Sequence, residues 1–213
     1  MRFTDRREAG ARLGEAVAER HPERPLVAAL PRGGVPVGYE VALALGCELD
    51  VLVVRKVGVP YQPELAMGAV GEKGVVVRNH DVLLAARVGE TAFEAAALAA
   101  IAEVETRVAV YRESAAAIDP TGRTVIVTDD GLATGSTALA AIDVARAKGA
   151  SLVWVAVPVA PPEAVRHVEA VADLVVTLHR PHRFMAVGAW YRDFTQTTTN
   201  EVQHLLRRSR GAH

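Results

Sequence analysis

The segment from Val125 to Thr137 constrains the fold more than any other part of the sequence. It reads VIVTDDGLATGST: a short β-branched run, two adjacent carboxylates, and a loop of small and hydroxylated residues. An Ala-rich segment begins directly after it, at Ala138. This order predicts a buried strand, a tight turn and the N-terminus of a helix, as in an α/β protein.

The predicted turn has the chemistry of a phosphate site. Gly131 and Gly135 would let backbone N–H groups approach an anion, and the positive end of the helix dipole would favour it. Thr134, Ser136 and Thr137 would add hydroxyl donors.

The acidic pair, Asp129 and Asp130, comes just before this turn and could hold sugar hydroxyls or a magnesium ion. A phosphate beside paired hydroxyls describes a ribose 5-phosphate. In a plainer interpretation the carboxylates only cap the helix. The complete arrangement of strand, acidic pair, loop and helix makes that the weaker option.

The same segment resembles the phosphoribosyl pyrophosphate (PRPP) signature of the type I phosphoribosyltransferases. In that family, four apolar residues, two acidic residues and two mostly apolar residues precede a small, hydroxyl-rich loop. Thr128 and Gly131 are mild departures, since larger aliphatic residues are usual there. The resemblance implies that Asp129 and Asp130 hold the ribose and Mg²⁺. It also implies a 5-phosphate loop made of Gly131, Leu132, Ala133, Thr134, Gly135, Ser136 and Thr137.

A second turn, Pro31-Arg32-Gly33-Gly34, follows a predicted strand at Leu26–Leu30. Its two glycines would let amides face an anion, and Arg32 could chelate phosphate oxygens. Alone, it could equally be a tight turn with an exposed arginine. In position and composition it resembles the pyrophosphate loop of the same family, which implies that Arg32, Gly33 and Gly34 bind pyrophosphate.

Two basic residues, Arg55 and Lys56, follow the next predicted strand, Leu49–Val54. Charges at the carboxyl end of a parallel strand lie where open α/β sheets bind ligands. The pair would suit a pyrophosphate, and the resemblance implies that contact, with Lys56 acting beside Arg32 in catalysis. A solvated strand end is the alternative.

Strands and helices alternate along the chain, and the strands are uniformly apolar. This predicts an α/β fold whose parallel sheet is covered on both faces. The resemblance implies a single phosphoribosyltransferase domain over residues 1–213 and a flavodoxin-like strand order, 2-1-3-4-5. In that order the two phosphate loops flank the point where ligands bind.

Two further segments stand apart from the alternating core. Residues 58–79 predict a β-hairpin with its turn at Gly71–Gly74, and the resemblance implies a flexible lid there. Glu64 and Glu72 are the carboxylates on that segment that could contact a nucleophile. Residues 179–198 concentrate aromatic side chains and predict either a hood that stacks a planar base or a small satellite core. His179 and His182 are spaced like possible metal ligands, but no third ligand is evident.

Composition limits the function classes. A net charge of −1 argues against nucleic acid as a partner. No apolar run is long enough to span a bilayer, no signal core is visible, and the single cysteine, Cys47, cannot form an intrachain disulfide. We therefore expect a cytoplasmic protein. Apolar residues at helical spacing over 90–117 predict core or dimer packing, and we expect a homodimer.

The resemblance implies transfer of phosphoribose from PRPP to a nitrogenous base or amine, with release of pyrophosphate, as in nucleotide salvage. Enzymes for 6-oxopurines usually carry an aspartate where this chain has Ala133, so that acceptor class is disfavoured. The alternative is a PRPP- or nucleotide-sensing regulator that binds nucleic acid without turnover. Hydrolysis or pyrophosphorolysis of a ribosyl phosphate is a weaker third option.

Overall fold

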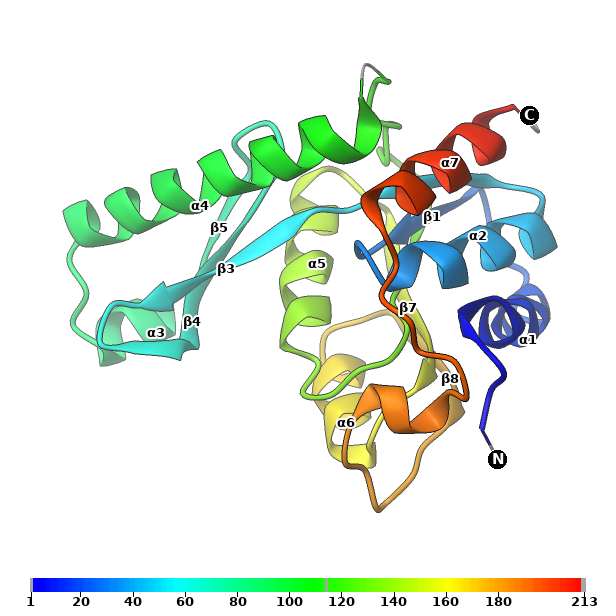
Figure 1. Ribbon diagram of the computed structural model, residues 1–213. Coiled ribbons are helices and arrows are strands. Elements are labelled where there is room, and N and C mark those ends of the chain that lie inside the picture. Colours follow the sequence, from blue (N-terminus) through cyan, green and yellow to red (C-terminus); the bar gives the residue numbers. More distant parts are fainter. Residues whose placement is uncertain (1, 114, 212–213) are drawn as a thin grey trace.

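A five-stranded parallel sheet lies at the centre of the protein, in a computed structural model that describes residues 2–113 and 115–211 (Figure 1). The strands lie in the order β2-β1-β6-β7-β8, and every neighbouring pair is parallel. Counted along the chain within this sheet, that order is 2-1-3-4-5, which confirms the predicted fold class. The strands are β1 (Pro25–Ala29), β2 (Glu48–Val51), β6 (Thr124–Thr128), β7 (Leu152–Val159) and β8 (Leu174–His179).

Helices cover both faces of this sheet. Successive residues of a strand face opposite sides, so Val27 of β1 joins one apolar core and Leu26 joins the other. Every residue of β6 is buried, as expected for a central strand covered twice. One face carries α1 (Arg6–Ala18), α2 (Gly34–Leu45) and α7 (Thr199–Arg210), and the other carries α5 (Ser136–Ala147) and α6 (Pro162–Glu169).

Residues 54–112 form an arm that projects from the central sheet (Figure 1). A three-stranded antiparallel sheet in the order β3-β4-β5 lies along α4 in this arm. The predicted turn at Gly71–Gly74 is confirmed, because β4 pairs with β5 and the Gly71 amide donates to the Val75 carbonyl at 2.9 Å. The arm's elements are β3 (Val54–Val59), β4 (Gln62–Gly71), β5 (Val76–Arg78), α3 (His80–Ala85) and α4 (Glu90–Arg112).

The second core strand is shorter than predicted, because β2 ends at Val51 and the chain leaves the central sheet. Its partner β1 ends at Ala29, paired with Val51, and the chain beyond β1 turns away. Val54 instead pairs with Gly71 of β4. Arg55 and Lys56 therefore begin the arm's sheet, and placing them at the end of a core strand was wrong.

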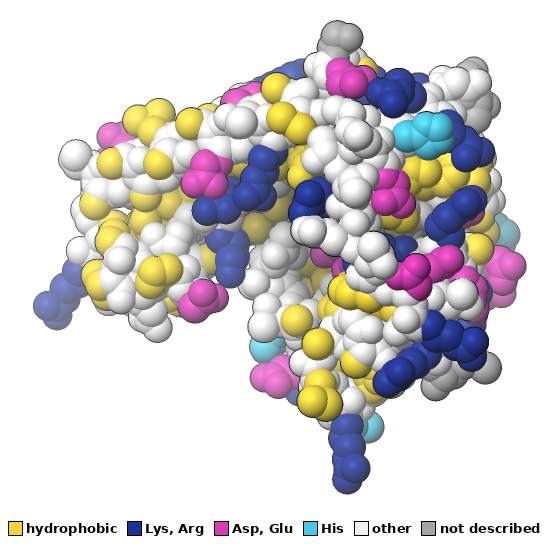
Figure 2. Space-filling model, in the orientation of Figure 1, with side chains coloured by type: hydrophobic (Ala, Val, Ile, Leu, Met, Phe, Trp, Pro, Cys, Tyr) yellow, Lys and Arg dark blue, Asp and Glu magenta, His cyan; other side chains and the backbone are white. Residues whose placement is uncertain are grey.

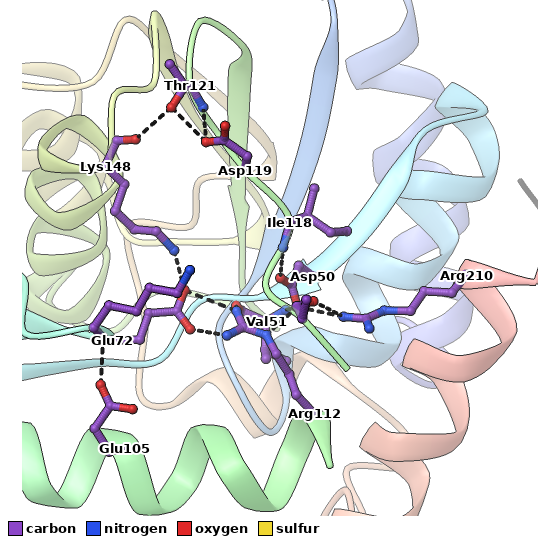
Figure 3. A network of polar contacts seen from close by, with 12 residues as sticks. Asp50, Val51, Glu72, Glu105, Arg112, Ile118, Asp119, Thr121, Lys148 and Arg210 are labelled. Carbon is purple, nitrogen blue, oxygen red and sulfur yellow. Dashed lines mark hydrogen bonds and ion pairs between the residues drawn. The ribbon is translucent and has the colours of Figure 1, made fainter. Parts of the chain in front are cut away.

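A buried network of charges fixes the arm to the core (Figure 3). The Arg112 guanidinium at the end of α4 donates to Asp50 Oδ1 at 2.9 Å and to the Val51 carbonyl at 2.8 Å, and it also pairs with Glu72. Lys148, after α5, pairs with the same Glu72 carboxylate. We call these four charged side chains (Asp50, Glu72, Arg112 and Lys148) the arm anchor. Each is less than a sixth exposed.

The anchor also explains why α4 ends at Arg112, before the predicted limit of residue 117; residue 114 of that range lies outside the described residues. Glu113 has a positive φ of 55°, so the chain turns there. The turn brings the Ile118 amide to Asp50 Oδ2 at 2.9 Å. Across the described ranges, no helix combines the length and apolar character needed to cross a membrane.

Candidate active site

The two predicted phosphate motifs are in direct contact at the carboxyl ends of the adjacent strands β1 and β6. The Leu30 amide donates to the Thr128 carbonyl at 2.9 Å. A Cβ on Gly34 would lie 2.6 Å from that carbonyl oxygen, and one on Gly33 would lie 2.1 Å from Asp130 Oδ2. Only glycine allows so close an approach. The Pro31–Gly34 turn is therefore shaped to receive the acidic pair.

The acidic pair carries more negative charge than its surroundings neutralise. Asp129 Oδ1 accepts from the Asp130 amide at 2.8 Å, and Asp130 Oδ2 accepts from Arg6 Nε at 2.8 Å. Burial and the neighbouring Asp130 carboxylate raise the pKa of Asp129 well above its usual range. Burial also raises the pKa of Asp130, although Arg6 opposes that rise. Such a site favours a ligand that brings hydroxyl donors or positive charge.

Two side chains that sequence reasoning missed hold Asp130. Arg6, the first residue of α1, pairs with its carboxylate, and Tyr191 Oη donates to its backbone carbonyl at 2.5 Å. Both residues are more than sixty positions away in sequence from Asp130. No local pattern marks the arginine. Tyr191 lies within the predicted hood, but nothing there points to Asp130.

The predicted 5-phosphate loop divides into two parts. Gly131 packs against the core and hood, since its Cβ would lie 2.7 Å from Val187 Cγ1, and the Leu132 amide donates to the Val159 carbonyl at 2.9 Å. Leu132 itself is buried. These two residues shape the loop, and their surroundings leave little room for an anion. The loop's open part therefore begins at Ala133.

The open part leads into the start of α5. Ala133, Thr134 and Thr137 are exposed, and the N-cap Gly135 supplies no capping side chain to the first helical turn. Thr134 Oγ1 donates to Ser136 Oγ at 3.1 Å, so the hydroxyl groups gather at the helix N-terminus. Amides and hydroxyls at the positive end of a helix dipole make an anion site.

Only one of the two predicted basic residues reaches this loop. Lys56 Nζ donates to Ser136 Oγ at 3.2 Å, whereas Arg55 Nε pairs with Glu103 of α4 at 3.0 Å. Neighbouring residues of a strand face opposite sides, so β3 cannot direct both toward α5. The structure brings Lys56 to the site and turns Arg55 away from it.

Arg32 lies half-buried in the turn after β1, and the peptide bond between Pro31 and Arg32 is cis. Within the part of the chain that the structure describes, its guanidinium has no hydrogen-bond or ion-pair partner. A cation without a protein partner beside a Gly-Gly turn is available to an anionic ligand.

The two lid carboxylates have different surroundings. Glu72 is only 1% exposed and belongs to the arm anchor, so contact with a nucleophile is closed to it. Glu64 is 96% exposed, with its Oε2 4.0 Å from Lys56 Nζ. The predicted turn at Gly71–Gly74 is thus the end of the hairpin that the core holds. The β3–β4 turn at residues 60–61 lies at the other end, where Tyr61 Oη donates to the Ala86 carbonyl within the arm.

A cavity of 570 Å³ opens between the arm and α5. Figure 2 shows the molecule hollowed beside the arm, with Lys and Arg side chains gathered on the arm's side of the hollow. Lys56 and Ser136 line the cavity, so it adjoins the 5-phosphate loop. Its other polar lining comes mainly from the arm: Glu64, Arg78, Asn79, His80 and Asp81, with Asp143 from α5.

The predicted hood is a small satellite core in this structure. The ring of Tyr191 lies 5.5 Å from that of Phe3 and 5.1 Å from that of Phe194, measured between centroids. His179 stacks on Trp190 at 6.0 Å. One face of Phe194 is covered by the Arg6 guanidinium, 3.9 Å from the ring centroid. The aromatic side chains therefore contact one another and Arg6, which favours the satellite-core interpretation over a base sandwich.

Comparison with known proteins identifies the family. The model of the phosphoribosyl transferase domain matches residues 3–189. The chain belongs to the phosphoribosyl transferase family. The family resemblance in the sequence is thus confirmed, together with the parallel-sheet fold.

Relatives of this phosphoribosyl transferase family member include curated and solved proteins. "Putative phosphoribosyl transferase" MT0597 and its counterpart Rv0571c, both from Mycobacterium tuberculosis, are 47% identical over 207 residues. The match covers 97% of this chain but 47% of each relative, so the chain spans about half the length of those proteins. TT1426 from Thermus thermophilus, whose crystal structure is known, shares 46% sequence identity with this chain. The two structures match with a TM-score of 0.92 over 98% of this chain and 99% of TT1426.

The acidic pair fits the way proteins bind magnesium beside phosphates. Among residues 2–113 and 115–211, no three His, Cys, Asp or Glu side chains are grouped closely enough to cage a metal. Mg²⁺ usually takes one or two carboxylates and completes its shell with water and substrate phosphates. Asp129 and Asp130 match that donor set, while an all-protein zinc site at His179 and His182 is without support.

Proposed function

We propose that this chain transfers the 5-phosphoribosyl group from PRPP to a nitrogenous base or amine and releases pyrophosphate. The observation that carries the proposal is the direct contact between the Arg32–Gly34 turn and the acidic pair, next to the hydroxyl-lined start of α5. The three features match in order the pyrophosphate, the ribose and the 5-phosphate of one molecule. Membership of the phosphoribosyl transferase family supports the same assignment.

The residues divide the substrate between them. Asp129 and Asp130 hold the ribose hydroxyls, and the loop from Ala133 to Thr137 holds the 5-phosphate. Arg32, with the Gly33–Gly34 backbone and Lys56, neutralises the pyrophosphate as negative charge develops on it. Asp129 and Asp130 would hold Mg²⁺, which would supply further positive charge to the leaving pyrophosphate.

Catalysis in this proposal is mainly electrostatic. The bond between the anomeric carbon and pyrophosphate breaks as the acceptor nitrogen approaches, and the enzyme lowers the barrier by stabilising the leaving group and aligning the nucleophile. Water would capture the electron-poor ribosyl centre, so the site must exclude it. Closure would have to come from the end of the hairpin at residues 60–61, because Glu72 fixes the other end to the core.

The experiment is a panel of bases and amines mixed with PRPP and Mg²⁺, with pyrophosphate release as the readout. We expect release that depends on a particular acceptor and is lost in the Asp129→Asn/Asp130→Asn protein. Ala133 predicts that adenine- or orotate-like acceptors are used before hypoxanthine or guanine. Release that is unchanged in the double variant would remove the site assignment.

The regulatory alternative makes a different prediction in the same assay. A sensor would bind PRPP without acceptor-dependent release and would bind RNA or DNA with an affinity that falls steeply with salt. A cytoplasmic homodimer remains our expectation for the assembled protein, and sedimentation would test the dimer.

A further inference from the structure

Arg6 is the cation that contacts the acidic pair. Its Nε donates to Asp130 Oδ2 at 2.8 Å, and its Nη1 donates to the Thr195 carbonyl at 2.8 Å. The two paired side chains are only 11% and 13% exposed. A charge-assisted hydrogen bond of this kind orients a carboxylate more strongly than a solvent-exposed pair does.

The guanidinium is itself held from several sides. It lies over the Phe194 ring, 3.9 Å from the centroid, and Thr195 accepts from it beside that ring. The chain before α1 is joined to the C-terminal segment, because the Phe3 amide donates to the Trp190 carbonyl and the Arg192 amide to the Phe3 carbonyl, both at 2.8 Å. Two distant segments of the chain thus fix one side chain.

We infer that Arg6 is a positioning residue, which fixes the orientation of the Asp130 carboxylate so that one of its oxygens is presented to a ribose hydroxyl. This inference rests on the proposed function. Arg6 engages Oδ2 through Nε, and Asp129 engages the Asp130 amide, so the Asp130 side chain has a defined orientation before any ligand arrives. Ribose recognition would then depend on a residue 124 positions away from Asp130 and on residues 190–195.

A competing role for Arg6 is direct contact with pyrophosphate. Its Nε would lie 3.4 Å from a Cβ on Gly33, so it is close to the predicted pyrophosphate turn. The two roles differ in a measurable way. A positioning residue acts only through Asp130 and only on ligands that carry ribose, whereas a direct contact acts on pyrophosphate itself.

The experiment measures Kd by calorimetry for three ligands: PRPP with Mg²⁺, ribose 5-phosphate, and pyrophosphate with Mg²⁺. The proteins are wild type, Arg6→Met, Arg6→Lys, Asp130→Asn and the Arg6→Met/Asp130→Asn double variant. Arg7→Met is the matched control, since Arg7 pairs with Glu40 of α2 and is 62% exposed. Thermal unfolding of each protein checks that it is folded.

We expect Arg6→Met to weaken the binding of PRPP and ribose 5-phosphate about 10-fold, as for loss of one hydrogen bond to a charged group. Its affinity for pyrophosphate should be unchanged. Arg6→Lys should lose less, and Arg7→Met should match wild type. In the Asp130→Asn background, Arg6→Met should have no further effect. If Arg6→Met does not fold, Phe194→Leu removes the ring beneath the guanidinium and should weaken only the ribose ligands, about 2-fold.

Three results would overturn the inference. Weaker pyrophosphate binding in Arg6→Met, or the same loss with and without Asp130, would make Arg6 a direct phosphate ligand. Unchanged affinities in Arg6→Met would give it no role in binding. Failure of wild type to bind PRPP with Mg²⁺ is a separate result, which would overturn the proposed function and this inference with it.

Discussion

Two pairs of carboxylates in this protein are largely removed from water, and their surroundings neutralise them very differently. In the arm anchor, Asp50 and Glu72 are matched by Arg112 and Lys148, and Arg210 lies 3.6 Å from Asp50. In the acidic pair, Arg6 is the only cationic side chain among the described residues that contacts a carboxylate, and it contacts Asp130 alone. A balanced cluster can stabilise a fold without a ligand. An unbalanced one is tolerated where a ligand completes it.

The pKa directions express the same contrast. Burial alone would raise the pKa of Glu72, but hydrogen bonds from Arg112 and Lys148 outweigh it and hold that pKa below its usual value. At Asp129, burial and the Asp130 carboxylate together raise the pKa, although a hydrogen bond from the Asp130 amide and the charge of Arg6 oppose that rise. The anchor therefore favours its charged form, while the acidic pair resists it.

The largest expected effect is on the anchor. Glu72→Gln should lower the free energy of unfolding by about 3–5 kcal/mol, because it leaves the buried Arg112 without a full counter-charge. Urea unfolding of the variant measures this. Glu64→Gln is the control in the same hairpin, and its exposed carboxylate should matter by less than about 0.5 kcal/mol. Equal losses in the two variants would mean that the anchor is not a stabilising cluster.

Substitution of the acidic pair should affect ligand binding rather than stability. Asp129→Asn with Asp130→Asn should weaken PRPP binding by about 100-fold or more, because two hydrogen bonds to charged acceptors are weakened. The same change removes the repulsion between two carboxylates but also takes the counter-charge from Arg6, and these opposing effects should leave the midpoint of thermal unfolding nearly unchanged. Calorimetric titration and a melting curve test both halves. A clear fall in stability with unchanged PRPP affinity would make the pair structural.

Much of the ligand site could be predicted from the sequence. The apolar strands and the small turns follow from local patterns, because neighbouring residues encode them. The strand order, which brings the two phosphate motifs together, was implied only by the family resemblance. Sequence could indicate that Asp129 and Asp130 lie at the carboxyl end of a core strand. It could not indicate that Arg6 lies against Asp130, since that contact depends on how the N-terminal helix packs.

The anchor could not be anticipated in the same way. Glu72 lies in a Gly-Glu-Lys-Gly turn, which in sequence is typical of an exposed loop, and local patterns carry no information about its burial by Arg112 and Lys148. The course of Arg55 and Lys56 was misjudged for a related reason: the length of β2 is set by the end of its neighbour β1, not by its own apolar residues.

Two lysines allow the two regions to be compared directly, because Lys56 lies at the ligand site and Lys148 lies in the arm anchor. Lys148→Met should lower the free energy of unfolding by about 1–3 kcal/mol, since Glu72 loses a buried partner, and should leave PRPP affinity unchanged. Lys56→Met should weaken PRPP about 10-fold, as for one charge-assisted contact, without a matching loss of stability. Arg55→Met, on the opposite side of β3, is the control for PRPP affinity. Loss of PRPP affinity in Lys148→Met, with loss of stability in Lys56→Met, would contradict the roles given to the two lysines.

The smallest effect is a difference in how stability depends on pH, measured by urea unfolding without Mg²⁺ or PRPP. Glu72 has a lowered pKa, so its contribution is present above its unfolded value of 4.5 and is lost as the pH falls through the folded value. Asp129 has a raised pKa, so its contribution is present below its unfolded value of 3.8 and is lost as the pH rises through the folded value. The free energy of unfolding of wild type minus that of Glu72→Gln should increase as the pH rises. The corresponding difference from Asp129→Asn should decrease. Slopes of the same sign would show that the two carboxylate pairs do not differ in electrostatic balance, because opposite slopes follow directly from one cluster favouring charge and the other resisting it.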